Sequence, residues 1–179
     1  MSVKLIIGPM WAGKSSHMGA CLERHRLAKQ SCIVVKYSLD NRYESVGLRT
    51  HSGREYLGFP VASASHLGDI VDELQYYDAI GIDEVQFFED AVEHIQLLAI
   101  AGKFVYAAGL DADYLAKPFS VVTNLLPLSE KVKKLSSVCN NCGKDASFSK
   151  RITNDTTRIV IGGHESYSTL CRVCMFGHS

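Results

Sequence analysis

Short apolar runs alternate with amphipathic stretches along the first 111 residues of the chain. The apolar runs are rich in valine and isoleucine, and they occupy residues 3–8, 32–38, 77–84 and 103–111. Runs of this length and composition predict strands that are buried on both faces. The stretches between them carry a helical pattern, at residues 14–29, 65–77 and 88–102. This alternation predicts an α/β fold in which helices flank a parallel sheet.

Local signals place the ends of several elements. Ser65 is the expected N-cap of the helix over residues 65–77, and Gly102 is the expected stop of the third helix. A short strand is expected near residues 59–62. The polar stretch 40–55 is interpreted as a long functional loop, because structureless segments of that length are otherwise uncommon.

The composition changes after about residue 136, where cysteine, asparagine, glycine, serine and threonine become dense. No helical period is recognised beyond this point. The sequence therefore predicts a first domain over residues 1–135 and a small zinc-binding domain over residues 136–179.

The charge balance argues against a protein that holds nucleic acid. Lys+Arg and Asp+Glu are both 19, so the formal net charge is zero, whereas non-specific phosphate-backbone binding requires a basic excess or stripe. The densest basic cluster is Lys131, Lys133 and Lys134, and a solvated strand end accounts for it.

The first ten residues do not resemble a signal peptide, and no apolar run is long enough to span a bilayer. Six cysteines without a secretory signal favour a reducing compartment, where Cys-x-x-Cys pairs bind metal more often than they form disulfides. We therefore expect a cytoplasmic protein that binds neither membrane nor nucleic acid.

The first strand is followed by a phosphate-binding motif, the P-loop. The residues GPMWAGKS give Gly8-x-x-x-x-Gly13-Lys14-Ser15 between a strand and a helix. Backbone N–H groups of such a loop surround the phosphates of ATP, lysine contacts the β- and γ-phosphates, and serine ligates Mg²⁺. A glycine-rich turn without a ligand is the alternative. The residues expected at this site are Gly8, Met10, Gly13, Lys14, Ser15 and Ser16.

Two adjacent carboxylates end the third apolar strand. Asp83 is the expected Mg²⁺ partner, held directly or through water, and Glu84 the expected general base. The alternative is that Glu84 caps the helical segment that follows. After the second strand, Asp40 and Arg42 fall at the carboxyl edge of the sheet, where ligands bind in such folds. Arg42 could stabilise a transferring phosphoryl group, although a surface ion pair explains an Asp-x-Arg loop equally well.

Four cysteines form two Cys-x-x-Cys pairs near the end of the chain, Cys139 with Cys142 and Cys171 with Cys174. Four thiolates suit a closed, tetrahedral and therefore structural Zn²⁺ site. A redox role is disfavoured because neither pair is expected between a strand and a helix. Between the pairs, Gly162 and Gly163 permit close backbone approach to a ligand, although a hairpin turn is the other interpretation.

Taken together these motifs resemble the type II thymidine kinases, which join a P-loop domain to a zinc domain. The resemblance covers nearly the whole chain and rests on GPMWAGKS, DNRY, GIDEVQFF, GLDADYLAKPF, IGGHESY and the cysteine pairs. It implies transfer of the ATP γ-phosphate to the 5′-hydroxyl of thymidine and more weakly of deoxyuridine, with Mg²⁺ as cofactor. It also implies a homotetramer and inhibition by thymidine triphosphate (dTTP).

By resemblance Glu84 would be the base, and Asp40, Arg42 and Asp83 would serve the phosphates and Mg²⁺. A "lasso" over residues 158–167 would close on the base mainly through backbone groups. The implied nucleoside site comprises Met10, Phe87, Leu110, Tyr114, Phe119, Arg158, Val160, Gly162, Gly163 and Tyr167. The chain departs from the family pattern at Trp11, where phenylalanine or tyrosine is more usual, and at Tyr114, where phenylalanine is typical. Residues 115–117 also lack the basic or glycine residue often found there.

Two other functions compete with this interpretation. An adenylate kinase also joins a P-loop to a zinc-bearing lid, but its lid interrupts the middle of the chain. A zinc-ribbon ATPase acting on nucleic acid is the second, and zero net charge argues against it.

Overall fold

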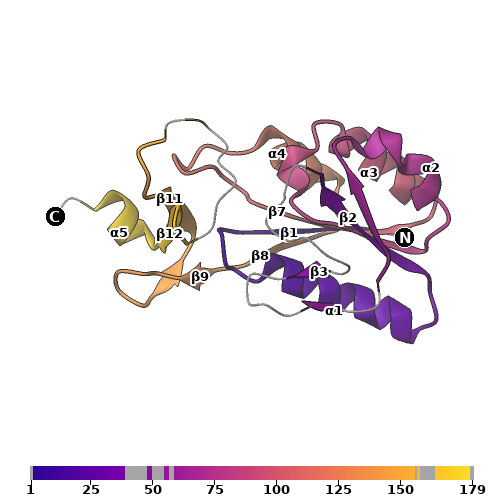
Figure 1. Ribbon diagram of the computed structural model, residues 1–179, viewed down its shortest axis with the longest axis horizontal. Helices are drawn as coiled ribbons and strands as arrows, with labels where there is room; N and C mark the ends of the chain where they lie inside the picture. The colour runs from indigo at the N-terminus through magenta and orange to yellow at the C-terminus, as the bar shows by residue number, and fades with distance from the viewer. Residues whose placement is uncertain are drawn as a thin grey trace.

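The structure is a computed structural model that describes residues 2–38, 48–49, 55–56, 59–155, 157 and 164–177. Its main feature is a six-stranded sheet in which every neighbouring pair is parallel (Figure 1). The order is β5-β2-β6-β7-β1-β8. The strands are β1 (Ser2–Ile7), β2 (Cys32–Tyr37), β5 (Val61–Ala64), β6 (Ala79–Ile82), β7 (Phe104–Gly109) and β8 (Lys131–Lys134). The parallel sheet predicted from the continuous apolar runs is confirmed.

Helices cover both faces of the sheet. The helix α1 (Lys14–Leu27) lies on one face, and α2 (Val71–Leu74), α3 (Ala91–Ile100) and α4 (Ser120–Leu125) lie on the other (Figure 1). Along β1, Leu5 packs in the cluster with α3 and α4, while Ile6 packs with Met18 and Leu22 of α1. Because successive side chains point to opposite faces, consecutive residues of a strand covered on both sides are buried and apolar, as Leu5, Ile6 and Ile7 are in β1.

The segment 65–77 differs from the single helix that was predicted. It forms a 3₁₀ turn, η1 (Leu67–Asp69), followed by the four-residue α2. Ser65 is not an N-cap, since its hydroxyl accepts a hydrogen bond from Ser38 Oγ at 3.2 Å. The carboxylate of Asp90 instead accepts from the N–H groups of Leu67 and Gly68. The cap therefore comes from a residue distant in sequence, which local propensity does not reveal.

Other predicted elements exist with adjusted ends. The first helix ends at Leu27, and Lys29 adopts a left-handed backbone with φ 60°. The third helix runs from Ala91 to Ile100, and Gly102 follows it with φ 91°. Within the predicted loop 40–55, Leu48–Arg49 (β3) pairs antiparallel with Glu55–Tyr56 (β4). The remainder of that loop lies outside the described residues.

The C-terminal segment lies beyond the carboxyl ends of the parallel strands (Figure 1). It contains two small antiparallel pairs and a short helix, α5 (Arg172–Phe176). The pairs are β9 (Ser137–Val138) with β10 (Asp145–Ala146), and β11 (Phe148–Arg151) with β12 (Tyr167–Leu170). The sequence shows no helical period after residue 136, and α5 is not visible in it because five residues are too few to show one.

None of the helices in the described ranges combines the length and the apolar character needed to cross a membrane.

Candidate functional site

The turn from Gly8 to Ser15 joins the end of β1 to the start of α1, as the motif predicts. Gly8 has φ 147° and Gly13 has φ 80°, both in the region that favours glycine. A Cβ at Gly8 would also collide with the carbonyl of Leu135, so this position requires glycine on two grounds. Gly13 is the N-cap of α1, whose N-terminal N–H groups therefore open toward the carboxyl edge of the sheet.

Two contacts connect this Gly8–Ser15 loop to its surroundings. The buried Lys14 ammonium donates to the carbonyl of Pro9 at 2.7 Å, across the inside of the loop. The Ser15 hydroxyl donates to Asp83 Oδ1 at 3.0 Å. Asp83 directly follows β6 and Ser15 lies in the first turn of α1, so the end of a strand and the start of a helix bring a carboxylate and a hydroxyl together. Ser16 lies in the first turn of α1.

The serine and aspartate oxygens suit a hard divalent cation. Burial raises the pKa of Asp83 to about 6, and the neighbouring Glu84 carboxylate adds to the effect, while Ser15 and Lys14 oppose it. Oxygen ligands of this kind, a hydroxyl and a carboxylate, are the type that Mg²⁺ prefers. A bound cation would offset the cost of keeping Asp83 ionised.

Glu84 adopts a left-handed backbone, with φ 53° and ψ 43°, at the start of the 3₁₀ turn η2 (Val85–Phe87). Its carboxylate does not cap this turn, which removes the capping interpretation. Glu84 Oε2 instead accepts a hydrogen bond from Gln86 Nε2 at 2.6 Å. Gln86 was not among the predicted site residues, and only its place two residues after the carboxylate in sequence hints at it.

The apolar side chains predicted for the nucleoside lie around this carboxylate-bearing edge. Phe87 belongs to η2, and its ring centroid is 5.4 Å from that of Tyr37. Leu110 follows β7, and its N–H donates to Gln86 Oε1 at 3.0 Å. Phe119 is buried at the N-cap of α4. Buried Met10 donates its N–H to Ser149 Oγ at 2.9 Å, a contact with β11 that the sequence did not indicate.

Tyr114 lies in a tight turn after β7. The buried Asp113 carboxylate accepts from the N–H groups of Leu115 and Lys117 at 3.0 and 2.9 Å, and Ala116 adopts a left-handed φ of 61°. Asp113 therefore shapes the turn that presents Tyr114.

A buried arginine joins two of the predicted nucleoside residues. The Arg151 guanidinium lies 4.1 Å from the ring centroid of Tyr114 and 5.2 Å from that of Tyr167. Its Nη2 donates to the Tyr167 hydroxyl at 2.6 Å, and Nη1 donates to the carbonyls of Asp155 and Thr157. Sequence reasoning missed Arg151, because an isolated arginine carries no motif.

Six predicted site residues lie outside the described residues, so the structure places none of them. They are Asp40, Arg42, Arg158, Val160, Gly162 and Gly163. Of the predicted lasso, the structure describes residues 164–167, and Tyr167 opens β12 as a buried residue.

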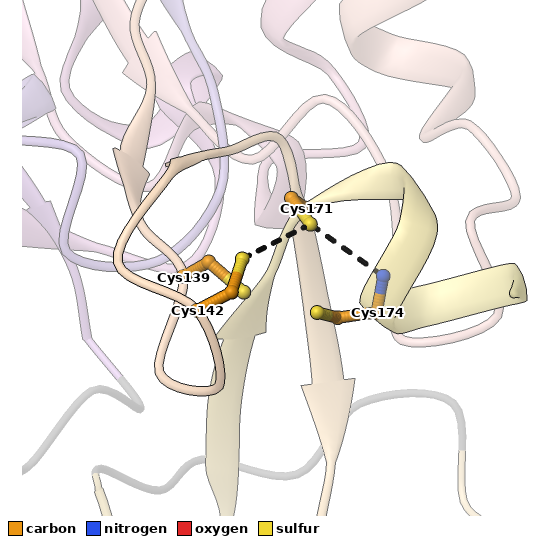
Figure 2. A group of neighbouring side chains, drawn as sticks. All are labelled: Cys139, Cys142, Cys171 and Cys174. Atoms are coloured by element: carbon orange, nitrogen blue, oxygen red, sulfur yellow. Dashed lines mark hydrogen bonds between the residues drawn. The ribbon is translucent and has the colours of Figure 1, made fainter. Parts of the chain in front are cut away.

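The four cysteines of the two pairs meet at one point, as predicted (Figure 2). Their sulfur atoms all lie within 4.8 Å of one another, and Cys142 Sγ is 3.6 Å from Cys171 Sγ. Tetrahedral zinc with Zn–S bonds of about 2.3 Å needs sulfur atoms about 3.8 Å apart. All four are free thiols rather than disulfides. The donor set and spacing fit a closed Zn²⁺ site.

The thiols also form one hydrogen-bonded cluster, in which their pKa values differ. Backbone N–H donation lowers the pKa of Cys139 to about 6 and lowers that of Cys171. Hydrogen bonding with Cys171 and the other thiols raises the pKa of Cys174 to about 12. Thiolates this close repel one another unless a metal ion neutralises them.

One argument against a redox role was wrong. Cys171 follows β12 and caps α5, accepting from the N–H of Cys174 at 3.5 Å, so this pair does lie between a strand and a helix. The convergence of four sulfur atoms, rather than two, now favours metal binding.

Known proteins resemble this chain over nearly its whole length. A family model described as thymidine kinase matches residues 1–175. The chain is 43% identical over 175 residues to the thymidine kinase of Vaccinia virus (strain Ankara), covering 98% of this chain and 97% of that protein. It is 44% identical over 174 residues to the thymidine kinase of Myxoma virus (strain Lausanne), covering 97% and 96%. It is 42% identical over 172 residues to that of Monkeypox virus, covering 96% and 95%.

Proposed function

This chain belongs to the thymidine kinase family, and we propose that it transfers the γ-phosphate of ATP to the 5′-hydroxyl of thymidine. The observation that carries the proposal is the hydrogen bond from Ser15 of the Gly8–Ser15 loop to Asp83, beside Glu84. Phosphate-binding backbone, a metal-binding oxygen pair and a base are the parts that phosphoryl transfer needs.

In the proposed reaction the Gly8–Ser15 loop holds the phosphates through backbone N–H groups and Lys14. The Lys14 ammonium leaves the Pro9 carbonyl for the phosphate oxygens. Mg²⁺ held by Ser15 and Asp83 would neutralise charge on the phosphates. Glu84 takes the proton of the 5′-hydroxyl while the oxygen of that hydroxyl forms its bond to the γ-phosphorus. The bond from that phosphorus to the bridging oxygen breaks, which leaves ADP. Asp40 and Arg42 are proposed to contribute from the loop after β2.

The nucleoside would lie among Met10, Phe87, Leu110, Tyr114 and Phe119, with Tyr167 at its outer side. The contact of Arg151 with both tyrosines supports this grouping, since one guanidinium holds two of the predicted residues together. A 5-methyl group in an apolar pocket contributes about 1–3 kcal/mol, so we propose deoxyuridine as a weaker substrate. Arg158, Val160, Gly162 and Gly163 are proposed to contact the base.

We propose that residues 136–179 form a zinc-binding domain whose metal is structural. The cysteine quartet supplies four ligands and leaves no open position for a substrate. The zinc would fix β9, β12 and α5, and through β12 the position of Tyr167. Inhibition by dTTP, a homotetrameric assembly and a cytoplasmic location are proposed from family membership alone.

The decisive experiment is a panel of nucleosides incubated with labelled ATP and Mg²⁺. We expect labelled monophosphate from thymidine, less from deoxyuridine, and none without Mg²⁺. Transfer of the label to AMP, added as a separate acceptor, instead of to any nucleoside would support an adenylate kinase. A shift of single-stranded DNA at physiological salt, with every nucleoside left unlabelled, would support the nucleic-acid ATPase. Either result would refute the proposal.

A further inference from the structure

Gln86 connects the proposed base to the wall of the nucleoside site. Its Nε2 donates to Glu84 Oε2 at 2.6 Å, and its Oε1 accepts from the N–H of Leu110 at 3.0 Å. The side chain is only 5% exposed. One amide therefore bridges the end of β6 and the residue that follows β7.

The orientation of this amide is determined by its partners. A backbone N–H can only donate, so the atom facing Leu110 must be the amide oxygen. The amide nitrogen then faces Glu84 and donates to its carboxylate oxygen Oε2. The two contacts therefore leave the amide a single arrangement.

The fold builds a fixed position for Gln86. Val85 and Phe88 are fully buried on either side, and the N–H groups of Phe87 and Phe88 donate to the carbonyls of Glu84 and Val85. A Cβ at Gly109 would collide with Gln86 Oε1 and the Val85 side chain. Glycine at position 109 therefore leaves the space that the amide fills.

Glu84 itself needs such support. Its left-handed backbone, φ 53°, is unfavourable for a residue with a Cβ and persists only where neighbours fix it. A carboxylate on a strained turn without a partner would sample several positions. A displacement of about 1 Å at a reacting group can cost about 10²-fold in rate.

We propose that Gln86 is a positioning residue, which holds the Glu84 carboxylate toward the 5′-hydroxyl of the nucleoside. Through its contact with Leu110, it also links the position of that carboxylate to the proposed nucleoside site. The inference rests on the proposed function, because it assumes that Glu84 is the base. Gln86 does not need to touch substrate.

The substitution Gln86→Glu separates the two contacts. A glutamate at this position has the same shape and still accepts from Leu110, but when ionised it cannot donate to Glu84 and repels it. We expect kcat to fall at least tenfold, with the thymidine dissociation constant within threefold of the parent. Gln86→Met removes both contacts, so we expect a lower kcat together with a raised thymidine KM. Gln96→Glu, on the exposed side of α3, adds the same charge and should leave both constants unchanged.

A double-mutant cycle distinguishes positioning from a general loss of structure. In a Glu84→Gln background, Gln86→Glu should change the residual kcat by less than threefold, since both substitutions act on one carboxylate. The same tenfold loss in both backgrounds would overturn the inference, as would near-parental kcat in Gln86→Glu. Melting temperatures of all variants report folding. If the parent protein does not phosphorylate thymidine, the proposed function fails instead.

Discussion

The indole ring of Trp11 stacks on the imidazole ring of His164, with centroids 4.0 Å apart and planes inclined by 7°. Trp11 lies in the Gly8–Ser15 loop with φ 56°, and His164 lies in the turn that precedes β12. With the bond from Met10 to Ser149, this stack is a second contact between the proposed phosphate site and the C-terminal segment. We therefore expect ligand binding at the proposed phosphate site to change the C-terminal segment, and the reverse.

Trp11 is the only tryptophan in the chain, so its fluorescence reports this contact directly. We expect thymidine to change the emission of the parent protein. His164→Ala should shift the emission to longer wavelength, because one ring face becomes exposed to water. An aromatic pair contributes about 0.5–1.5 kcal/mol, so thymidine binding should weaken about two- to tenfold. His66→Ala, an exposed histidine, is the control, and identical spectra for both variants would contradict the prediction.

Replacement of Glu84 by glutamine should reduce kcat by about 10²–10⁴-fold, the range that general base catalysis contributes. The thymidine KM should change little, because the amide keeps the shape of the side chain. Steady-state kinetics of Glu84→Gln beside Glu89→Gln, an exposed neighbour, make the comparison. Near-normal turnover in Glu84→Gln would refute its role as the base.

Purified protein should contain about one zinc per chain, on the stoichiometry of four thiolates. Cys174→Ser should lose the metal and lower the melting temperature, because a structural zinc contributes folding free energy. Cys21→Ser, which lies in α1, should keep it. Metal analysis that finds no zinc in well-folded protein would exclude the zinc site.

Asp83→Asn should make the metal-free protein more stable while abolishing activity. Burial raises the pKa of Asp83 to about 6, so the folded state binds its proton more tightly than the unfolded chain does. The stabilisation that this tighter proton binding gives the folded state is fully present below about pH 4, and it is lost as the pH rises through about 6. At pH 7.5 the neutral asparagine avoids this loss, worth at most about 3 kcal/mol.

Urea unfolding of both proteins between pH 4 and 8, without Mg²⁺, tests this expectation. The stability advantage of Asp83→Asn should grow between pH 4 and 7 and then remain constant. The expectation would be contradicted if the parent protein were as stable as Asp83→Asn, or more stable, at pH 7.5.

Arg151→Lys should raise the thymidine KM more than it lowers kcat. Lysine keeps the charge but cannot donate simultaneously to the Tyr167 hydroxyl and to the carbonyls of Asp155 and Thr157. Tyr114 and Tyr167 would then lose their common partner. Arg172→Lys, an exposed arginine over the Phe148 ring, is the matched control. Equal KM values for the two variants would show that Arg151 does not organise the nucleoside site.

Periodicity predicted the parallel sheet because a strand covered on both faces is apolar along its buried part, as in Leu5–Ile7 of β1, Cys32–Val35 of β2 and the whole of β6. It failed at residues 65–77, where Asp90 supplies the cap from another part of the chain. It also missed α5, whose cap is a cysteine of the quartet. The first failure arises because a distant residue supplies the cap, and the second because five residues are too few to show a helical period.

By itself the sequence determined the chemistry: glycines where the backbone must turn, a serine at a helix start, two carboxylates at a strand end, and four cysteines in two pairs. The groups that these residues bind constrain their type and spacing, so the motifs can be recognised without a structure. Only the tertiary structure decided which groups support them. Gln86 holds Glu84, Arg151 holds Tyr114 and Tyr167, and Trp11 stacks on His164. Such contacts form where strand ends and turns that are distant in sequence meet in the fold. The order of residues in the sequence does not show where they meet.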